Sequence, residues 1–242
     1  MSLISVADVR KVYQVDHERI VALDRISLEI GQGEICCVLG TSGSGKSTLL
    51  NILAGLEKPT KGRVLIDGKV VSEYSEKQWA LFRQKNIGFV FQSYNLMPTL
   101  TAIENVAMPL TFRGVGKKER TKRSVQMLKA VRLGNRLLHK PTQMSGGQQQ
   151  RVGIARAFVS RPKIVFADEP TGNLDSKTSR EVMEIMIAMA KQYHETLIIV
   201  THDNEIAKYA DRIITIHDGS VKSDETNVSI LESETKEEEN AV

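Results

Sequence analysis

The feature that most constrains this chain is a glycine-rich segment between an apolar run and a helical pattern. Residues Gly40-Thr-Ser-Gly-Ser-Gly-Lys-Ser-Thr48 match the phosphate-binding pattern G-x-x-x-x-G-K-S/T. The run Ile35–Leu39 precedes the segment, and the apolar spacing of Lys46–Ala54 predicts a helix after it. In such a loop, glycines let successive backbone N–H groups turn toward one anion, and the helix N-terminus adds its positive end. The sequence therefore predicts a site for the phosphates of a nucleotide.

Each polar residue of this loop has an expected role. Lys46 can reach the β- and γ-phosphates as a point charge, and Ser47 can place its hydroxyl on Mg²⁺. The residues expected to contact the nucleotide are Gly40, Thr41, Ser42, Gly43, Ser44, Gly45, Lys46, Ser47 and Thr48.

Two acids follow another apolar run. Asp168 and Glu169 come directly after Ile164–Ala167, and ligands bind at the carboxyl ends of strands in open parallel sheets. We expect Asp168 to hold Mg²⁺ and Glu169 to orient or deprotonate the attacking water. Without the glycine-rich loop, a helix N-cap would be the better interpretation of these acids.

Short apolar runs rich in Val and Ile recur along the chain, with helical patterns between them. Because the runs are continuous, they are typical of strands buried on both faces of a parallel sheet. Ser75 with Gln78 fits a capping box that begins a short helix, and Asp175 or Ser176 can cap the helix after the two acids. The alternation of the runs with helices predicts an α/β fold, and the glycine-rich loop makes it one of the P-loop NTPase type. The runs are Leu3–Val6, Ile35–Leu39, Val64–Ile66, Ile87–Phe91, Ile164–Ala167, Leu197–Val200 and Ile213–Ile216.

Two regions depart from this pattern. Residues 1–35 and 60–75 are turn-rich and predict a small antiparallel layer. Residues 93–159 lack strand runs and predict a helical subdomain inserted between two core strands. The 242 residues suffice for one large domain with such a subdomain.

Charge is distributed unevenly. Residues 224–242 carry a net charge of −6 and residues 1–223 carry +10, so we expect a folded domain over 1–223 and a disordered acidic tail over 224–242. Residues 113–140 hold ten Lys or Arg and one acid, Glu119. That segment is either a solvated helix face or a surface attracted to anionic lipid.

Neither a membrane-spanning run nor a secretory signal is visible. The adjacent Cys36 and Cys37 lack the spacing of a metal site and fit small buried side chains in a reducing compartment. These features predict a cytosolic chain.

The segment Met144-Ser-Gly-Gly-Gln-Gln-Gln-Arg151 predicts a second helix N-terminus that can bind an anion. With this segment the chain resembles the ATP-binding cassette (ABC) family, from about residue 3 to residue 222. Gly40–Thr48 corresponds to its Walker A loop, and Asp168 with Glu169 to Walker B and the catalytic acid. Ser145, Gly146, Gly147 and Gln148 correspond to the signature, where Met144 stands in place of the usual Leu.

The resemblance assigns further residues. Tyr13 corresponds to the aromatic residue that stacks on adenine, Gln92 to the Q-loop glutamine that contacts the metal, Asp175 to the D-loop, and His202 to the switch histidine at the γ-phosphate. It also implies that two copies pair head to tail around two ATP molecules. Each ATP would lie between the Walker A loop of one copy and the signature of the other, where the signature helix stabilises γ-phosphate charge.

Within the family, the chain is most similar to the macrolide-export and lipoprotein-release type (MacB, LolD and FtsE). The segments that carry this similarity are Gly88–Leu96, Glu104–Val106, Gln148–Arg151 and Ala167–Asp175. The type implies a peripheral subunit on the inner face of the cell membrane that drives a separate transmembrane permease. The type also implies contact with a periplasmic or extracellular adaptor through that permease. An FtsE-like regulatory cassette without transport and an amino-acid importer ATPase stay open as alternatives. No nucleic-acid partner is expected, because the chain has a single set of motifs without long coiled coils.

Overall fold

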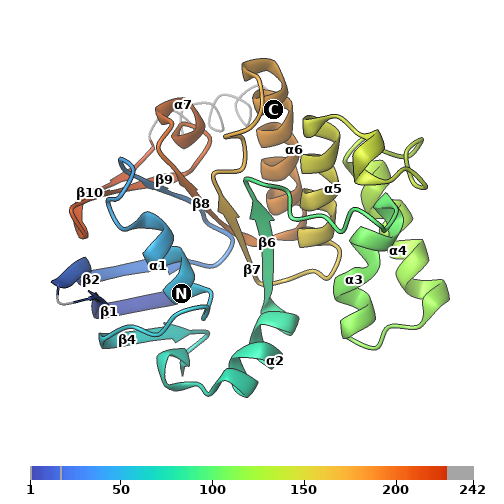
Figure 1. The fold of residues 1–242 in the computed structure, drawn as a ribbon. Coiled ribbons are helices and arrows are strands. Elements are labelled where there is room, and N and C mark those ends of the chain that lie inside the picture. The colour runs from blue at the N-terminus through green and yellow to red at the C-terminus, as the bar shows by residue number, and fades with distance from the viewer. Residues whose placement is uncertain (1, 17, 228–242) are drawn as a thin grey trace, which may run out of the picture. The chain divides into compact units, whose positions relative to one another are not determined.

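The computed structural model describes residues 2–16 and 18–227, which form two compact units (Figure 1). The first unit combines the chain up to Tyr74 with the chain from Ile198 onward, and the second runs from Ser75 to Leu197. The first unit contains β1 (Ser2–Val15), β2 (Glu18–Gly31), β3 (Ile35–Leu39), α1 (Lys46–Leu53), β4 (Lys61–Ile66), β5 (Lys69–Val70), the 3₁₀ turn η1 (Val71–Glu73), α7 (Asn204–Ala207), β9 (Arg212–His217) and β10 (Ser220–Thr226). The second contains α2 (Glu76–Asn86), β6 (Ile87–Phe91), α3 (Ala102–Phe112), α4 (Lys117–Ala130), η2 (Pro141–Gln143), α5 (Gly146–Phe158), β7 (Ile164–Asp168) and α6 (Ser176–Tyr193). Along β8 (Thr196–Thr201) the chain passes from the second unit back to the first.

The first unit contains the predicted antiparallel layer, a four-stranded sheet in the order β2-β1-β4-β5. Two of the continuous apolar runs, Leu3–Val6 and Val64–Ile66, pair with each other in this sheet. Both runs therefore lie in the antiparallel layer predicted for residues 1–35 and 60–75, and the general interpretation of continuous runs as parallel strands does not hold for them. Within these runs Ser5 and Leu65 are only partly buried, so one face of each strand is less buried than the other. A run of three or four residues does not show that alternation in the sequence.

The strand that leads into the glycine-rich loop pairs with a strand from near the other end of the described chain. β3 lies parallel to β9, with Cys36 opposite Arg212 and Leu39 opposite Thr215, and β9 pairs antiparallel with β10. Cys36 and Cys37 are buried free thiols, as predicted. Burial raises the pKa of the Cys36 thiol, which keeps it protonated and unreactive.

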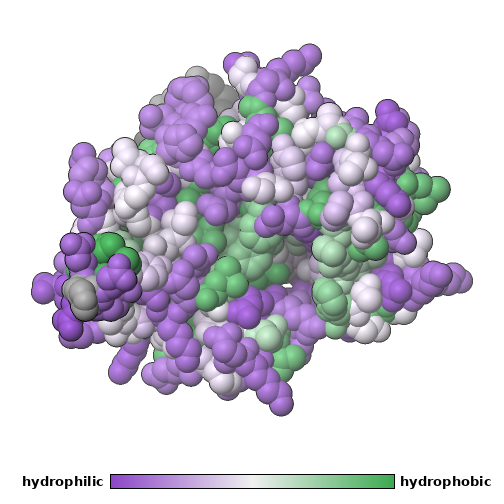
Figure 2. Space-filling view, in the orientation of Figure 1, coloured by the Kyte–Doolittle hydropathy of each residue, from purple (hydrophilic) through white to green (hydrophobic). Residues whose placement is uncertain are grey.

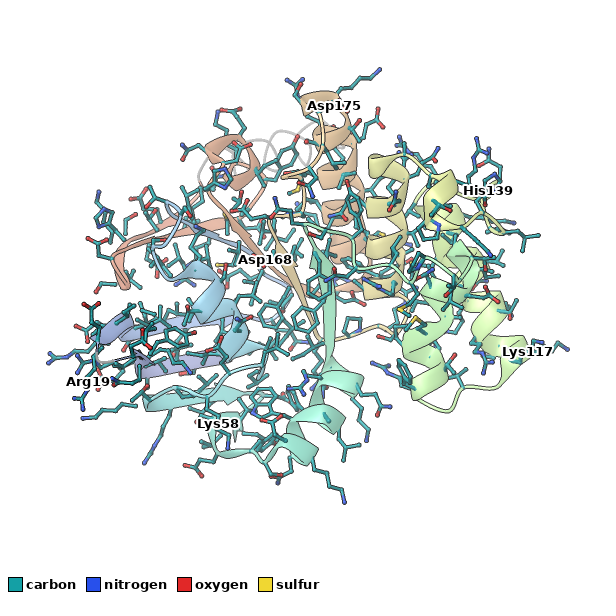
Figure 3. All side chains as sticks on the ribbon, viewed as in Figure 1. Arg19, Lys58, Lys117, His139, Asp168 and Asp175 are labelled. Carbon is teal, nitrogen blue, oxygen red and sulfur yellow. The ribbon has the colours of Figure 1, made fainter. Side chains whose placement is uncertain are left out.

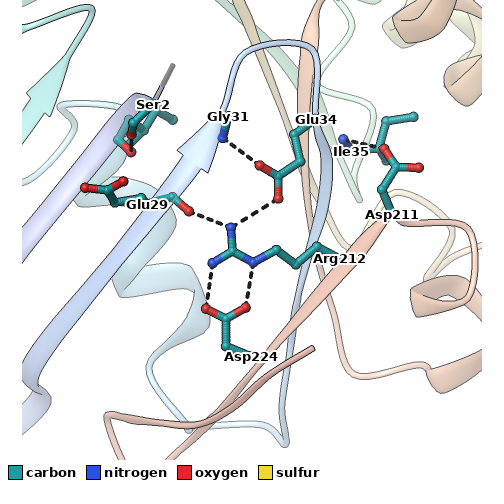
Figure 4. A network of polar contacts seen from close by, with 9 residues as sticks. Ser2, Glu29, Gly31, Glu34, Ile35, Asp211, Arg212 and Asp224 are labelled. Carbon is teal, nitrogen blue, oxygen red and sulfur yellow. Dashed lines mark hydrogen bonds and ion pairs between the residues drawn. The ribbon is translucent and has the colours of Figure 1, made fainter. Parts of the chain in front are cut away.

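Arg212, the first residue of β9, connects three segments of the first unit (Figure 4). Its Nε and Nη2 donate to the two carboxylate oxygens of Asp224 at 2.5 and 2.6 Å. Its Nη1 donates to the Glu29 carbonyl at 2.7 Å and to Glu34 Oε1 at 3.3 Å. The hydrogen bonds to Asp224 raise the pKa of Arg212, so a permanent charge joins β9 to β10 and to the β2–β3 connection.

Asp224 therefore corrects the predicted start of the acidic tail. Strand β10 extends to Thr226, three residues beyond the expected boundary at 223, because the paired carboxylate belongs to the sheet. Residues 228–242, the rest of the predicted tail, lie outside the described residues.

Replacing Asp224 by Asn should lower the free energy of unfolding by about 1 kcal/mol, since the bidentate pair with Arg212 is partly exposed. Urea denaturation at low and high salt measures the loss, which should shrink as salt screens the pair. Glu225→Gln is the matched control, because Glu225 is an exposed neighbour on the same strand. Equal stability of the two variants would contradict a stabilising role for the pair.

In the second unit, two parallel strands flank a helical insertion. β6 pairs with β7, with Ile87 opposite Ile164 and Phe91 opposite Asp168. Residues 93–159, which the sequence predicts as a helical subdomain, contain α3, α4, η2 and α5 and no strand, and all of them are described. Figure 1 shows α3, α4 and α5 gathered together, and α6 follows β7. The compact unit is larger than the predicted insertion, because it includes α2, β6, β7 and α6.

The same capping box begins three helices of the second unit. The hydroxyl of the N-cap residue accepts a hydrogen bond from the backbone N–H three residues later, and the side chain at that later position accepts from the N-cap N–H. The pairs are Ser75 with Gln78, Thr101 with Glu104, and Ser145 with Gln148. The sequence predicts the first of these boxes, and all three fix helix starts by local interactions alone.

Among residues 2–16 and 18–227, no helix combines the length and the apolar character that a bilayer span requires.

Candidate functional site

The glycine-rich loop leaves β3 and enters α1 with the backbone geometry that a phosphate site needs. Gly45, the N-cap of α1, has φ of 104°, in the left-handed region. A Cβ atom at Gly45 would lie 2.5 Å from the Ala22 carbonyl oxygen, so both its conformation and its surroundings require glycine. The loop is also tied to the β9–β10 turn, because the Gly219 N–H donates to the Ser44 carbonyl at 3.0 Å.

The polar side chains of the loop are suited to an anionic ligand. Lys46 is buried, and its Nζ donates to the Thr41 carbonyl at 2.8 Å. The Ser44 hydroxyl is buried without a hydrogen-bond partner, whereas the side chain of Ser47, in the first turn of α1, is exposed. A buried cation and an unsatisfied hydroxyl beside a helix N-terminus fit the phosphate groups of a nucleotide.

Two predicted residues outside the loop lie near it in the first unit. The Tyr13 hydroxyl, on β1, donates to Glu57, and Glu57 also accepts from Asn51 of α1, the helix that follows the loop. His202 is exposed and directly follows β8, whose last residue, Thr201, accepts a hydrogen bond from the Gly40 N–H at 3.3 Å. The first unit therefore brings the predicted adenine-stacking residue and the predicted switch histidine close to the phosphate-binding loop.

The second unit brings the predicted acids together with the predicted Q-loop glutamine. Asp168 ends β7 directly opposite Phe91 of β6, so Gln92 lies at the same sheet edge as Asp168 and Glu169. Glu169 has φ of 44°, a costly conformation for a residue that is not glycine. The Gly172 N–H donates to the Glu169 carbonyl at 3.1 Å and closes a turn there. The backbone therefore changes direction at Glu169, directly after the end of β7.

The predicted D-loop packs on the Q-loop. Asn173 Nδ2 donates to the Gln92 carbonyl at 3.0 Å, and Asp175 is the N-cap of α6, where it accepts from the backbone N–H of Thr178 at 3.0 Å. Hydrogen bonds from Thr178 hold the pKa of Asp175 below its usual value. Figure 3 shows Asp175 at the end of α6 and Asp168 at the end of β7. Asp175 is exposed, as a residue that contacts a second copy must be.

The predicted signature forms the start of α5. Ser145 is the exposed N-cap of the helix, and Gln148 completes its capping box. Gly146 lies close to the Tyr94 hydroxyl, since a Cβ atom at Gly146 would be 2.7 Å from it. The Q-loop, which includes Tyr94, and the signature helix therefore pack against each other within the second unit.

Sequence reasoning missed two side chains of α5 that connect these loops. Gln150 is buried, and its Nε2 donates to the Pro170 carbonyl, directly after Glu169. Arg156 donates to the carbonyls of Tyr94 and Asn95, which have φ of 60° and 48°. Burial lowers the pKa of Arg156, but as an arginine it stays charged. Gln150 falls on the apolar face of α5, and a polar residue on such a face was the signal that could have found it.

Gly147→Ala should lower the free energy of unfolding by about 1–3 kcal/mol, because overpacking a tight contact strains its neighbours. A Cβ atom at Gly147 would lie 2.3 Å from Thr178 Cγ2, and Asp175 holds Thr178 in place. Thr178→Ser removes that methyl group, so the double variant should recover most of the lost stability in urea denaturation. A destabilised single variant without such recovery would contradict the contact.

A groove of about 610 Å³ lies elsewhere in the second unit. Its lining is largely apolar and contains Leu81 of α2, Phe89 of β6 and Phe112 of α3, with Arg156 at its polar side. Figure 2 shows a largely hydrophilic face with scattered apolar side chains. Phe112 and Leu81 are 67% and 53% exposed, and because they line one groove they form a contiguous apolar surface of the kind that marks interaction sites.

The predicted site residues thus fall into two groups. Tyr13, Gly40–Thr48 and His202 lie in the first unit. Gln92, Ser145–Gln148, Asp168, Glu169 and Asp175 lie in the second. The approach of the phosphate-binding loop to Asp168 stays a prediction. Within the described residues, no group of three or more His, Cys, Asp or Glu side chains is placed to hold a metal ion. The predicted Mg²⁺ would therefore depend on phosphate oxygens as well, as is usual for this ion.

Comparison with known proteins identifies relatives along nearly the whole chain. Residues 23–172 match the family model of the ABC transporter. The chain is 48% identical over 223 residues to an ABC transporter ATP-binding protein of Thermotoga maritima, an alignment that covers 91% of this chain and 94% of that one. It is also 48% identical over 228 residues to the macrolide export ATP-binding/permease protein MacB of Brucella melitensis, covering 94% of this chain but 35% of MacB. This chain thus spans about a third of the length of that relative.

Solved structures that resemble this chain are also ATP-binding cassettes. The ATP-binding cassette MJ0796 of Methanocaldococcus jannaschii, solved as a dimer bound to ADP and Pi in a post-hydrolysis state, aligns with a TM-score of 0.85 at 43% identity. That alignment covers 93% of this chain and 98% of the other. CbiO1 of Clostridium perfringens, part of the transporter complex CbiONQ, aligns with a TM-score of 0.85 at 30% identity, covering 96% of this chain and 92% of that one.

Proposed function

The chain belongs to the ABC transporter family, and from this premise we propose that it binds and hydrolyses ATP to drive a separate transmembrane permease of the export or mechanotransmission type. The predicted α/β fold and the predicted ATPase family are confirmed by the matches. The observation that carries the proposal is the phosphate-binding loop, with Lys46 buried inside it and the Ser44 hydroxyl unsatisfied.

In the proposed reaction, water attacks the γ-phosphorus of ATP while the bond from that phosphorus to the β,γ-bridging oxygen breaks, giving ADP and phosphate. Glu169 accepts the proton of the attacking water. Lys46 and the loop N–H groups hold the β- and γ-phosphates, and His202 contacts the γ-phosphate. Ser47, Gln92 and Asp168 would hold Mg²⁺, which when bound neutralises phosphate charge.

We propose that the active form contains a second copy of the chain, paired head to tail. Ser145 and Asp175 are exposed at the ends of α5 and α6, where a facing copy can reach them. The dimeric MJ0796 structures support this arrangement by analogy. The α5 N-terminus of one copy would then face the γ-phosphate bound by the other and stabilise its charge.

The permease is proposed to dock in the groove that contains Leu81 and Phe112. The MacB relative, named as an ATP-binding/permease protein, continues well beyond the region that this chain matches. The name of that relative pairs an ATP-binding part with a permease, which supports a permease as the partner of this chain. A cytoplasmic position on the inner membrane face, and contact with an adaptor through the permease, follow from the same proposal.

Four arginines of the basic segment 113–140 make hydrogen bonds within the second unit. Arg113 donates to three backbone carbonyls, Arg120 and Arg123 donate to one each, and Arg136 contacts His139. These four arginines hold the fold. Figure 3 shows Lys117 projecting from the start of α4, where exposed lysines dominate. The exposed lysines fit a solvated helix face, and attraction to anionic lipid is the alternative interpretation.

A coexpression experiment tests the permease proposal. The chain is produced together with a membrane permease that co-purifies with it, and membranes are washed and probed for the bound cassette. Phe112→Asp should abolish recruitment while the ATPase activity of the purified chain persists, because Phe112 lies outside the nucleotide site. Leu138→Asp is the control, since Leu138 is 78% exposed and does not line the groove. Unchanged recruitment of the Phe112 variant would reject the groove as the docking site.

A further inference from the structure

The side chain of Tyr13 is anchored from the segment that follows the phosphate-binding helix. Its hydroxyl donates to Glu57 Oε2 at 2.5 Å. The ring is therefore attached at its polar end to the segment that follows α1. Tyr13 and Glu57 are 44 positions apart in the sequence, so no local pattern reveals this link.

Glu57 is itself held at both carboxylate oxygens. Asn51 Nδ2 donates to Oε1 at 3.0 Å, and Lys11 Nζ lies 3.1 Å from Oε2. The Asn51 carbonyl also accepts from the Glu57 N–H at 3.2 Å. The side chains of Lys11 and Glu57 are 16% and 27% exposed, so water competes little for these contacts. A carboxylate with this many partners has one strongly preferred orientation.

The protonation states agree with this arrangement. Burial opposes the charge on Glu57, but hydrogen bonds from Tyr13, Asn51 and Lys11 outweigh it and hold the pKa of Glu57 below its usual value. Burial and the hydrogen bond to Glu57 raise the pKa of the Tyr13 phenol. Tyr13 is therefore the donor and Glu57 the charged acceptor at neutral pH.

Lys11 also limits where a base can stack. Its Nζ lies over the Tyr13 ring, 5.0 Å from the centroid, a distance at which a cation is attracted to an aromatic face. With one face of the ring occupied, a nucleotide base has only the opposite face available.

We propose that Glu57, held by Asn51 and Lys11, is a positioning residue for the nucleotide base, because it fixes the Tyr13 ring in the orientation on which adenine stacks. The inference rests on the proposed ATP-binding function and on the stacking role of Tyr13. A ring that is ordered before binding loses no rotational freedom when the base arrives. Glu57 thereby couples recognition of the base to the helix that binds the phosphates.

The test compares binding of ATP with binding of inorganic tripolyphosphate, both with Mg²⁺, to the full chain. Glu57→Gln replaces one of the two acceptor oxygens by an amide NH₂ group. The variant can therefore accept from Asn51 or from Tyr13 but not from both. It should weaken ATP binding roughly three- to tenfold, the range expected for losing one such hydrogen bond and the order it imposes. Tripolyphosphate binding should not change, because that ligand has no base. In turnover, KM for ATP should rise by the same factor and kcat should stay the same.

Two further variants define the mechanism. Tyr13→Phe keeps the ring and removes its hydroxyl, so it should reproduce the loss seen for Glu57→Gln. The double variant should lose no more than either single one, since both remove the same contact. Glu18→Gln, at an exposed glutamate of the same unit, should bind both ligands normally. Thermal melting of each variant reports whether the fold is intact.

The variants distinguish a failure of the positioning role of Glu57 from a failure of the stacking role of Tyr13. If Tyr13→Ala binds ATP as tightly as the natural chain, the stacking role of Tyr13 is wrong, and the inference fails with it. If Tyr13→Ala loses affinity while Glu57→Gln does not, Tyr13 keeps its role and the positioning role of Glu57 is overturned. Equal losses for ATP and tripolyphosphate in Glu57→Gln would also overturn it, because they would indicate damage to the phosphate site.

Discussion

Replacing Glu169 by Gln should lower ATP turnover at least about a hundredfold, the lower end of what a positioned general base contributes, and leave ATP binding intact. Glutamine matches glutamate in shape but cannot accept the proton of the attacking water. Glu169 follows β7 at the sheet edge shared with Gln92, and its φ of 44° fixes how the chain leaves the strand. The amide should preserve that conformation. The loss should therefore fall on kcat rather than on ATP affinity.

The same variant should accumulate as an ATP-bound dimer. If hydrolysis separates the two copies, blocking it leaves them joined by the two nucleotides. Size-exclusion chromatography with ATP and Mg²⁺ measures the dimer, and phosphate release measures turnover. Glu184→Gln, at an exposed position on α6, should behave like the natural chain in both assays. Near-normal turnover of the Glu169 variant would remove the role assigned to this carboxylate, whatever its dimerisation.

The second large effect is expected at Glu195, between α6 and β8. This residue is 3% exposed, and both carboxylate oxygens lack a hydrogen-bond partner. Burial raises its pKa from 4.5 to about 8, an effect that Arg161 only partly offsets. Because the folded-state pKa exceeds the unfolded value, the folded state holds the proton more tightly. This contribution to stability is complete below pH 4.5 and is lost as the pH rises toward 8.

Glu195→Gln should therefore stabilise the chain at pH 8 to 9. The rise of the pKa corresponds to at most about 5 kcal/mol, and relaxation of the site will reduce this to roughly 2–4 kcal/mol. Urea denaturation of the variant and the natural chain at several pH values measures the difference, which should grow from pH 5 to pH 8 and then level off. Glu184→Gln again serves as the control. A difference that does not change with pH would show that Glu195 is ionised in the folded chain as in the unfolded one.

The features that the sequence predicted correctly are those set by neighbouring residues. The loop Gly40–Thr48 and the capping box of Ser75 with Gln78 depend on contacts within a few positions, and both are found where their patterns predict them. The assignment of Asp175 as a possible cap of α6 is confirmed for the same reason. Strand positions were also predictable, because continuous runs of Val and Ile rarely occur elsewhere.

The features that were missed depend on residues far apart in the chain. The tail boundary at 223 was misplaced because the partner of Asp224, Arg212, is 12 positions away across a hairpin. The link from Tyr13 to Glu57 and the hydrogen bond of Gln150 to Pro170 require the folded arrangement to be known. Patterns of hydrophobicity carry no information about which polar groups meet. The roles of the site residues stay predictions that the variants above address.

The capping box at the start of α5 complicates how mutants of the signature serine should be interpreted. The hydroxyl of Ser145 serves the first turn of its own helix as well as any nucleotide bound by a facing copy. Ser145→Ala therefore mixes a folding defect of about 1 kcal/mol with a catalytic one. Two other helices allow the folding defect to be estimated separately, since Ser75 and Thr101 form the same capping box and are not among the predicted nucleotide-binding residues. The stability lost in Ser75→Ala and Thr101→Ala estimates the folding component, and a turnover defect of Ser145→Ala measured under conditions where that variant is fully folded gives the catalytic component.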